Sequence, residues 1–188
     1  MDHVELFKKA QILFLDEKYE ESIEIFTKAI EAGANPYLAH LSRGVVYLKL
    51  KEVDKALHDF DEAINENSQS ARAYFFRGTV YMMKDEFEKA VSDFSKAIEL
   101  KSGYFMARFS RGVAYARMNK LDEASADIKA VMPEMELNMQ GFLDTHGIVR
   151  TELFKVMEQL SSGRPLLSLK LSDKEINTLE KWLKEEEA

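Results

Sequence analysis

The chain contains 188 residues, of which 46% are apolar and 31% charged, the composition of an ordinary soluble globular protein. The lack of cysteine excludes disulfides, thiolate metal sites and a cysteine nucleophile. Since no signal-peptide pattern or 18-residue apolar run occurs either, we expect a cytoplasmic protein without a membrane span. The formal net charge of −7 argues against nucleic acid as a partner, because binding to phosphates requires clustered Lys and Arg.

Apolar residues recur at helical spacing in eight segments, which pair across short polar connectors. The pattern predicts antiparallel helix pairs at Asp2–Leu15 with Glu20–Glu31, Pro36–Leu50 with Val53–Asn65, Ala71–Met83 with Phe87–Leu100, and Tyr104–Met118 with Leu121–Met132. These pairs define units of about 3–36, 37–70, 71–104 and 105–133. Each pair buries one face internally and another against its neighbour, so no pair is expected to be stable alone.

The same residue types return every 34 residues through these units. The repeating positions are Gly44, Gly78 and Gly112; Ala56, Ala90 and Ala124; Arg43, Arg77 and Arg111; Asp59, Asp93 and Asp127; and Tyr47, Tyr81 and Tyr115. Gly78 and Ala90 lie almost symmetrically about a turn, so we expect them opposite one another where two helices cross closely. A mid-helix glycine costs about 0.5–1 kcal/mol relative to alanine, so its recurrence indicates a packing requirement.

Each repeating arginine precedes a repeating aspartate by 16 residues, which places the two on facing turns of one helix pair. We interpret them as structural ion pairs; the alternative is an arginine ladder that binds a ligand. The first unit has Lys9 and Ile25 at these positions and loses the pair.

Helix-turn-helix units of 34 residues, with small residues flanked by aromatic ones, resemble the tetratricopeptide repeat family. The matching residues are Tyr74, Gly78, Tyr81, Ala90, Phe94 and Ala97, then Gly44, Tyr47, Ala56, Phe60 and Ala63. The chain departs from the family pattern where Ala34, Ser68 and Ser102 replace the proline that commonly ends a unit. The resemblance implies an all-α fold, a right-handed α-solenoid of antiparallel helix pairs over residues 1–133. Residues 134–188 would form a C-terminal helical extension.

In that family the first helix of each pair lines a concave groove that holds peptides or helices of partner proteins. Carried over to this chain, the inward positions include Val4, Gln11, Phe14, Leu38, Arg72 and Ala116. The residues expected to contact a partner are Phe7, Leu41, Val45, Leu48, Phe75, Thr79, Met82, Met106, Phe109 and Val113. The alternative is that some of these apolar residues pack between helices.

A subset of the family grips a chaperone's terminal carboxylate with lysine, arginine and asparagine. Phe7, Ser42, Phe76 and Ser110 stand near the corresponding positions here, so we do not expect that function.

The 34-residue period fails after Pro133. Leu153, Val156, Met157 and Leu160 form one helical stripe, and Ile176, Leu179, Trp182 and Leu183 form another after a capping box at Ser172. We expect capping helices that cover the apolar end of the array. The alternative is that part of this segment folds back into the groove and regulates it.

No reactive constellation is apparent. The histidines, His3, His40, His58 and His146, lack metal-ligand spacing, and the glycines do not cluster as in a phosphate loop. We therefore expect no enzyme activity, metal or cofactor, and a protein or peptide as the partner. The sequence favours a non-catalytic adaptor; the alternative is a self-associating or autoinhibited assembly protein whose groove is covered by its own C-terminal segment or by a second copy.

Overall fold

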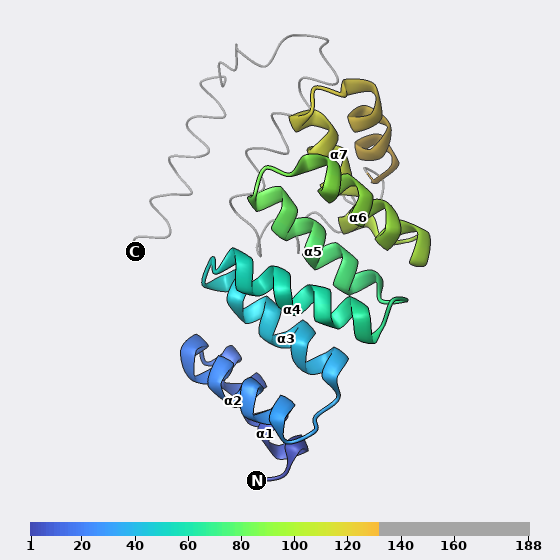
Figure 1. Ribbon diagram of the computed structural model, residues 1–188. Helices are drawn as coiled ribbons and strands as arrows, with labels where there is room; N and C mark the ends of the chain where they lie inside the picture. Colours follow the sequence, from blue (N-terminus) through green and yellow to red (C-terminus); the bar gives the residue numbers. More distant parts are fainter. Residues whose placement is uncertain (132–188) are drawn as a thin grey trace, which may run out of the picture. The chain divides into compact units, whose positions relative to one another are not determined.

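The computed structural model describes residues 1–131, which form paired α-helices without a strand in that range (Figure 1). The helices are α1 (His3–Leu15), α2 (Tyr19–Glu31), α3 (Pro36–Lys49), α4 (Val53–Glu66), α5 (Ala71–Met83), α6 (Phe87–Leu100), α7 (Phe105–Arg117) and helix 121–131. The predicted helix pairs are confirmed, and the bounds of α1 to α7 differ from the expected ones by no more than one residue. The expected end of the last helix at Met132 and the helices expected in 134–188 lie outside the described residues.

Polar residues at the first positions fix where several helices begin. The Asp2 carboxylate accepts hydrogen bonds from the Val4 and Glu5 amides at 2.9 and 2.8 Å, and the Glu5 carboxylate accepts one from the Asp2 amide. This reciprocal capping box satisfies amides that have no partner within the helix. The side chains of Asn35 and Ser70 cap α3 and α5 by accepting one hydrogen bond each, from the Leu38 and Ala73 amides.

The turn inside each pair has one residue with left-handed backbone conformation. These residues are Glu17, Lys51, Asp85 and Asn119, with φ of 58, 58, 56 and 60°, and they are spaced 34 residues apart. The amide after each one donates back to the first helix, as from Glu86 to the Tyr81 carbonyl at 2.9 Å. Repetition of this turn gives all pairs a common geometry.

Glycine in the first helix makes room for an aromatic ring of the second. A Cβ added to Gly78 would lie 2.8 Å from the Phe94 ring, and one added to Gly44 would lie 2.7 Å from the Phe60 ring. Both rings are fully buried. The packing reason for the glycines is confirmed, but Phe94 rather than Ala90 takes the space beside Gly78, because the ring reaches across the crossing point.

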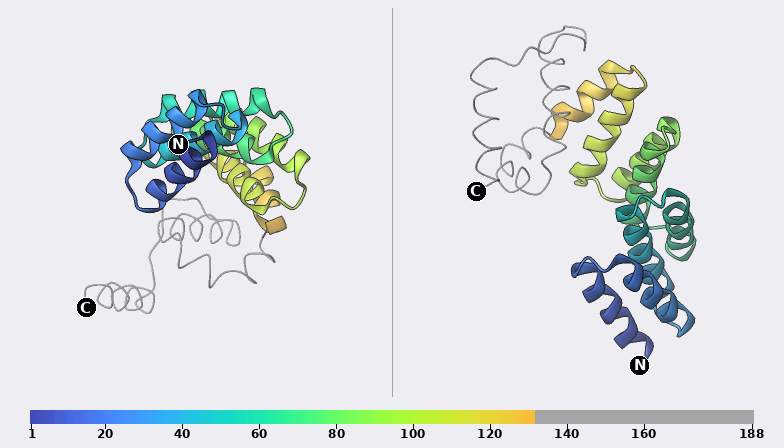
Figure 2. Two further views of the ribbon diagram at one scale, coloured as in Figure 1. Left: turned by 90° about the horizontal axis from the view of Figure 1, so that it is seen from below. Right: turned by 90° about the vertical axis from the view of Figure 1, so that its left-hand side faces the viewer.

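Consecutive pairs stack because each second helix packs against the next first helix, as α2 does against α3 and α4 against α5. Consecutive first helices α1, α3, α5 and α7 also contact one another along the array. Figure 2 shows the pairs succeeding one another along an arc from α1 to helix 121–131. The first helices therefore form the inner layer of this helical solenoid, and the second helices form the outer layer.

Candidate functional site

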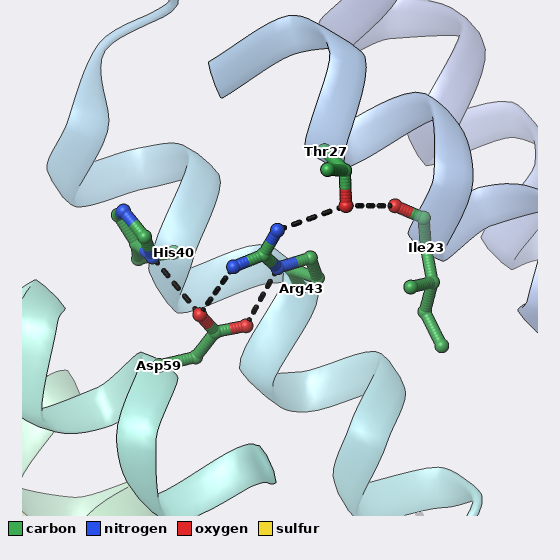
Figure 3. Close-up of polar contacts among 5 residues, drawn as sticks. All are labelled: Ile23, Thr27, His40, Arg43 and Asp59. Atoms are coloured by element: carbon green, nitrogen blue, oxygen red, sulfur yellow. Dashed lines mark hydrogen bonds and ion pairs between the residues drawn. The ribbon is translucent and has the colours of Figure 1, made fainter. Parts of the chain in front are cut away.

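Arg43 holds two successive helix pairs together (Figure 3). Its Nε and Nη2 donate to the two Asp59 carboxylate oxygens at 2.8 and 2.7 Å, and its Nη1 donates to Thr27 Oγ1 of the preceding unit at 2.9 Å. His40 Nδ1 lies 2.9 Å from Asp59 Oδ1. The Asp59 side chain is 1% exposed, so this charge is buried and is fully occupied by protein partners.

The next two arginines repeat this arrangement. Arg77 donates through Nε and Nη2 to Asp93 at 2.7 and 2.8 Å, and Arg111 donates to Asp127 at 2.7 Å through both nitrogens. The three predicted ion pairs are thereby confirmed. Because the guanidinium groups are engaged by carboxylates of the same chain, the alternative of a ligand-binding arginine ladder is not supported.

The third nitrogen of each arginine bonds to the preceding unit, a contact that sequence reasoning missed. Its acceptors are Thr27, Asp61 and Ser95, which lie 2.9, 2.8 and 3.0 Å from the Nη1 atoms. They are spaced 34 residues apart and all carry a side-chain oxygen, and this spacing was the available signal. Each arginine therefore links the units as well as the two helices of its own pair.

Charge pairing stabilises the ionised form of these half-buried arginines. Hydrogen bonding to Asp93 raises the pKa of Arg77, with a further rise from Asp61, against the lowering effect of burial. Asp59 and Asp127 raise the pKa of Arg43 and Arg111 in the same way. The arginine contacts thus fix the stacking of the units and hold the first helices in register.

The exposed side of the first helices carries four rows of residues at 34-residue spacing, which we call the inner face. The rows are Val4, Leu38, Arg72 and Met106; Gln11, Val45, Thr79 and Val113; Phe14, Leu48, Met82 and Ala116; and Leu15, Lys49, Met83 and Arg117. All of these side chains are exposed or half-buried. The last row was not among the expected contact residues, although the repeat spacing could have identified it.

Two residues expected at the partner surface are buried instead. Leu41 is 4% exposed and packs with Phe60, Ala73 and Val80, and Phe109 is 8% exposed. Their expected exposure is wrong, because this row of each first helix lies at the edge of the inner face, where adjacent helices meet. The other expected contact residues are half-buried: Phe7, Val45, Leu48, Phe75, Thr79, Met82, Met106 and Val113.

Aromatic rings support the middle of the inner face. The Phe75 ring lies 5.1 Å from the Tyr104 ring and 5.9 Å from the buried Phe94 ring, measured between centroids. Phe76 stacks on Phe60 with centroids 5.5 Å apart. Phe75 therefore joins the apolar surface to the core, and it is only partly available to a ligand.

The inner face carries positive charge and no carboxylate. Helices α3, α5 and α7 contain no Asp or Glu, and the four rows contain Lys49, Arg72 and Arg117. Lys49 and Arg72 are exposed and make no ion pair with any of residues 1–131. Arg117 donates to the exposed Asp85 at 3.1 Å.

Neither a metal-ligand cluster nor a membrane-spanning helix occurs in the part of the chain that the structure describes. Within residues 1–131, no group of three or more His, Cys, Asp or Glu side chains is arranged to hold a metal ion. No helix in the same range has the length and apolar character needed to cross a membrane. The C-terminal segment, which we expect to cap the array or, as the alternative, to fold back into the groove, lies outside the described residues.

Comparison of the chain with known protein families identifies one match. A family model described as tetratricopeptide repeat matches residues 7–64 and 41–105, together more than half of the chain. No curated protein matches the chain.

Several solved structures share the fold. The first repeat domain of Spaghetti (RPAP3), bound to the HSP90 peptide SRMEEVD, is 24% identical, with a TM-score of 0.61 over 63% of this chain and 94% of that one. MamA from Desulfovibrio magneticus RS-1 is 23% identical, with a TM-score of 0.66 over 70% and 75% of the two chains. YrrB, described as having an unusual peptide-binding site, is 24% identical, with a TM-score of 0.63 over 70% and 68%.

Proposed function

The chain belongs to the tetratricopeptide repeat family, and from that premise we propose that it is a non-catalytic adaptor. In this proposal a segment of another protein, apolar or amphipathic, lies along the inner face in a helix-in-groove mode. Members of the family generally mediate protein interactions, and one structural relative has been solved with a bound peptide.

The observation that carries the proposal is the set of partly exposed apolar side chains on the inner face. Val4, Leu38 and Met83 are 47, 44 and 44% exposed, and half-buried residues such as Val45 and Met82 lie in the same rows. Contiguous apolar surface of more than a few hundred Å² commonly marks an interaction site. Fully burying each large apolar side chain stabilises a complex by about 1.5–3 kcal/mol.

The substitution that tests partner binding must be at a residue that is not fully buried, so that the fold is kept. Phe109→Glu would place a charge at a site that is 8% exposed and would unfold the array, so loss of binding would be uninformative. Met82→Glu changes a half-buried position of the inner face instead. Ile12→Glu is the matched control, because Ile12 is 58% exposed on α1 and lies outside the four rows.

The test captures partners from the native cell with the intact chain and both variants, then titrates a synthetic peptide of the captured segment. We expect Met82→Glu to lose the peptide while Ile12→Glu retains it, with unchanged helical circular dichroism in both. Equal binding by the two variants contradicts the proposal. Sedimentation of the free chain identifies the alternative: self-association that Met82→Glu abolishes would assign the inner face to a second copy.

A further inference from the structure

Charge is segregated between the two layers of helices. The inner helices α3, α5 and α7 contain no Asp or Glu, and the inner helix α1 contains one, Glu5. The outer helices α2, α4 and α6 contain no Arg and carry 12 of the 22 Asp and Glu residues in 1–131. The formal net charge of −7 therefore coexists with three inner helices, α3, α5 and α7, whose only formally charged residues are Lys and Arg.

Some of these inner cations are neutralised within the chain. Arg43, Arg77 and Arg111 are held by carboxylates of the outer helices. Lys49 and Arg72 are exposed on the inner face and have no ion-pair partner among residues 1–131. These two side chains are thus available to a ligand that lies along this surface.

Arg72 lies three residues before Phe75 on α5, so the two side chains are neighbours on the surface of that helix. Burial raises the pKa of Tyr104, and the positive charge of Arg72 opposes that rise. The Tyr104 ring also contacts Phe75, with 5.1 Å between centroids. An apolar contact and a cation are therefore offered side by side to the same ligand.

We propose that the occupant of the inner face is an acidic amphipathic segment, which alternates apolar anchors with carboxylates. This inference rests on the proposed adaptor function and specifies the chemistry of its partner. A neutral or basic segment would cover Arg72 and Lys49 without pairing them, and an uncompensated buried charge is strongly unfavourable. An acidic segment forms charge-assisted hydrogen bonds at the same positions.

The test uses the intact chain and three synthetic helical peptides of about 18 residues with identical leucine faces. Their polar faces carry glutamate, glutamine or lysine. We expect the glutamate peptide to bind about tenfold more tightly than the glutamine peptide, the size of one charge-assisted hydrogen bond, and the lysine peptide to bind most weakly. The preference should shrink as salt is raised, because the cations are exposed.

The decisive variant is Arg72→Glu, with Lys28→Glu as its control. Both change the net charge equally, but Lys28 is an exposed residue of the outer helix α2. Arg72→Glu should remove the preference for glutamate over glutamine, and Lys28→Glu should leave it within twofold. Loss of the preference in both variants, or in neither, overturns the assignment to the inner face.

The outcomes separate this inference from the proposed function. Binding of all three peptides with equal affinity, abolished by Met82→Glu, overturns the acidic partner and leaves the adaptor function supported. Failure of every peptide to bind overturns the acidic partner, and the capture experiment with Met82→Glu and Ile12→Glu then decides the adaptor function. If the free chain self-associates, the glutamine and glutamate peptides can be compared as competitors that dissociate it. Equal dissociation by the two peptides assigns the inner face to a second copy and overturns the acidic partner.

Discussion

Arg77 Nη1 donates to Asp61 at 2.8 Å, across the boundary between two helix pairs. The same guanidinium holds Asp93 of its own pair through Nε and Nη2. One side chain therefore joins three helices, α4, α5 and α6. Equivalent arginines at 43 and 111 use a hydroxyl, Thr27 or Ser95, where Arg77 uses a carboxylate.

Replacing Asp93 by alanine should lower the free energy of unfolding by about 3–5 kcal/mol, because it leaves the Arg77 charge largely buried beside a single, half-exposed carboxylate. Urea unfolding followed by circular dichroism measures the change. Asp54→Ala is the control, since Asp54 pairs with Lys84 but its side chain is 86% exposed. A loss of stability no larger than that of the control contradicts a structural role for the buried pair.

Replacing Ser95 by aspartate should stabilise the fold. The substitution gives Arg111 the second carboxylate that Asp61 supplies to Arg77, at a half-buried position. We expect a gain of up to about 1 kcal/mol, decreasing at high salt. Ser92→Asp adds the same charge at an exposed position of α6 and should give no comparable gain. Identical effects of the two substitutions in thermal unfolding would show that the arginine contact is irrelevant.

Replacing Gly78 by alanine should destabilise the fold by about 1–3 kcal/mol, because the new Cβ would lie 2.8 Å from the Phe94 ring. Adding Phe94→Leu should recover part of the loss, which a double-mutant cycle detects. Gly103→Ala serves as control, since no atom lies within 4 Å of its added Cβ. A Gly78→Ala variant as stable as the parent would contradict the close crossing of α5 and α6.

Tyr104 should make stability sensitive to alkaline pH. Burial raises its pKa above the ordinary value of 10.0, so its contribution is fully present below that pH and is lost as pH rises through the folded-state pKa. Arg72→Gln removes a charge that lowers this pKa and should shift the titration further upward. Ultraviolet titration, with Tyr104→Phe subtracted, measures the shift. No shift, or a downward one, would mean that Arg72 does not lie near the phenol.

The sequence predicts the helix bounds and the buried ion pairs because the repeat is strong. Gly78, Arg77 and Asp93 recur at one phase, and the 16-residue spacing identifies each pair before any coordinates exist. The acceptors that bond to the arginine of the next unit are harder to predict. Thr27, Asp61 and Ser95 each carry a side-chain oxygen but differ in residue type. The repeat strength therefore determines which contacts can be predicted.

Burial at the edge of the inner face does not follow from residue type. Leu41 and Phe109 are apolar whether they contact a partner or a neighbouring helix, and the packing of adjacent helices buries them, as in the cluster of Leu41 with Phe60 of α4. The residue types at the left-handed turn positions do not predict their backbone conformation either. Glu17 and Lys51 adopt positive φ without the glycine that commonly signals it, because the amides that follow them bond back to the first helix.

The central claim is that the inner face of the first helices receives a partner segment. Methyl NMR of the intact chain, titrated with the glutamate peptide described above, tests it most directly. We predict shifts at Val45, Leu48, Met82 and Val113, with Leu57 and Val91 of the outer helices unchanged. Shifts confined to the outer helices, or spread evenly over both layers, would contradict the claim.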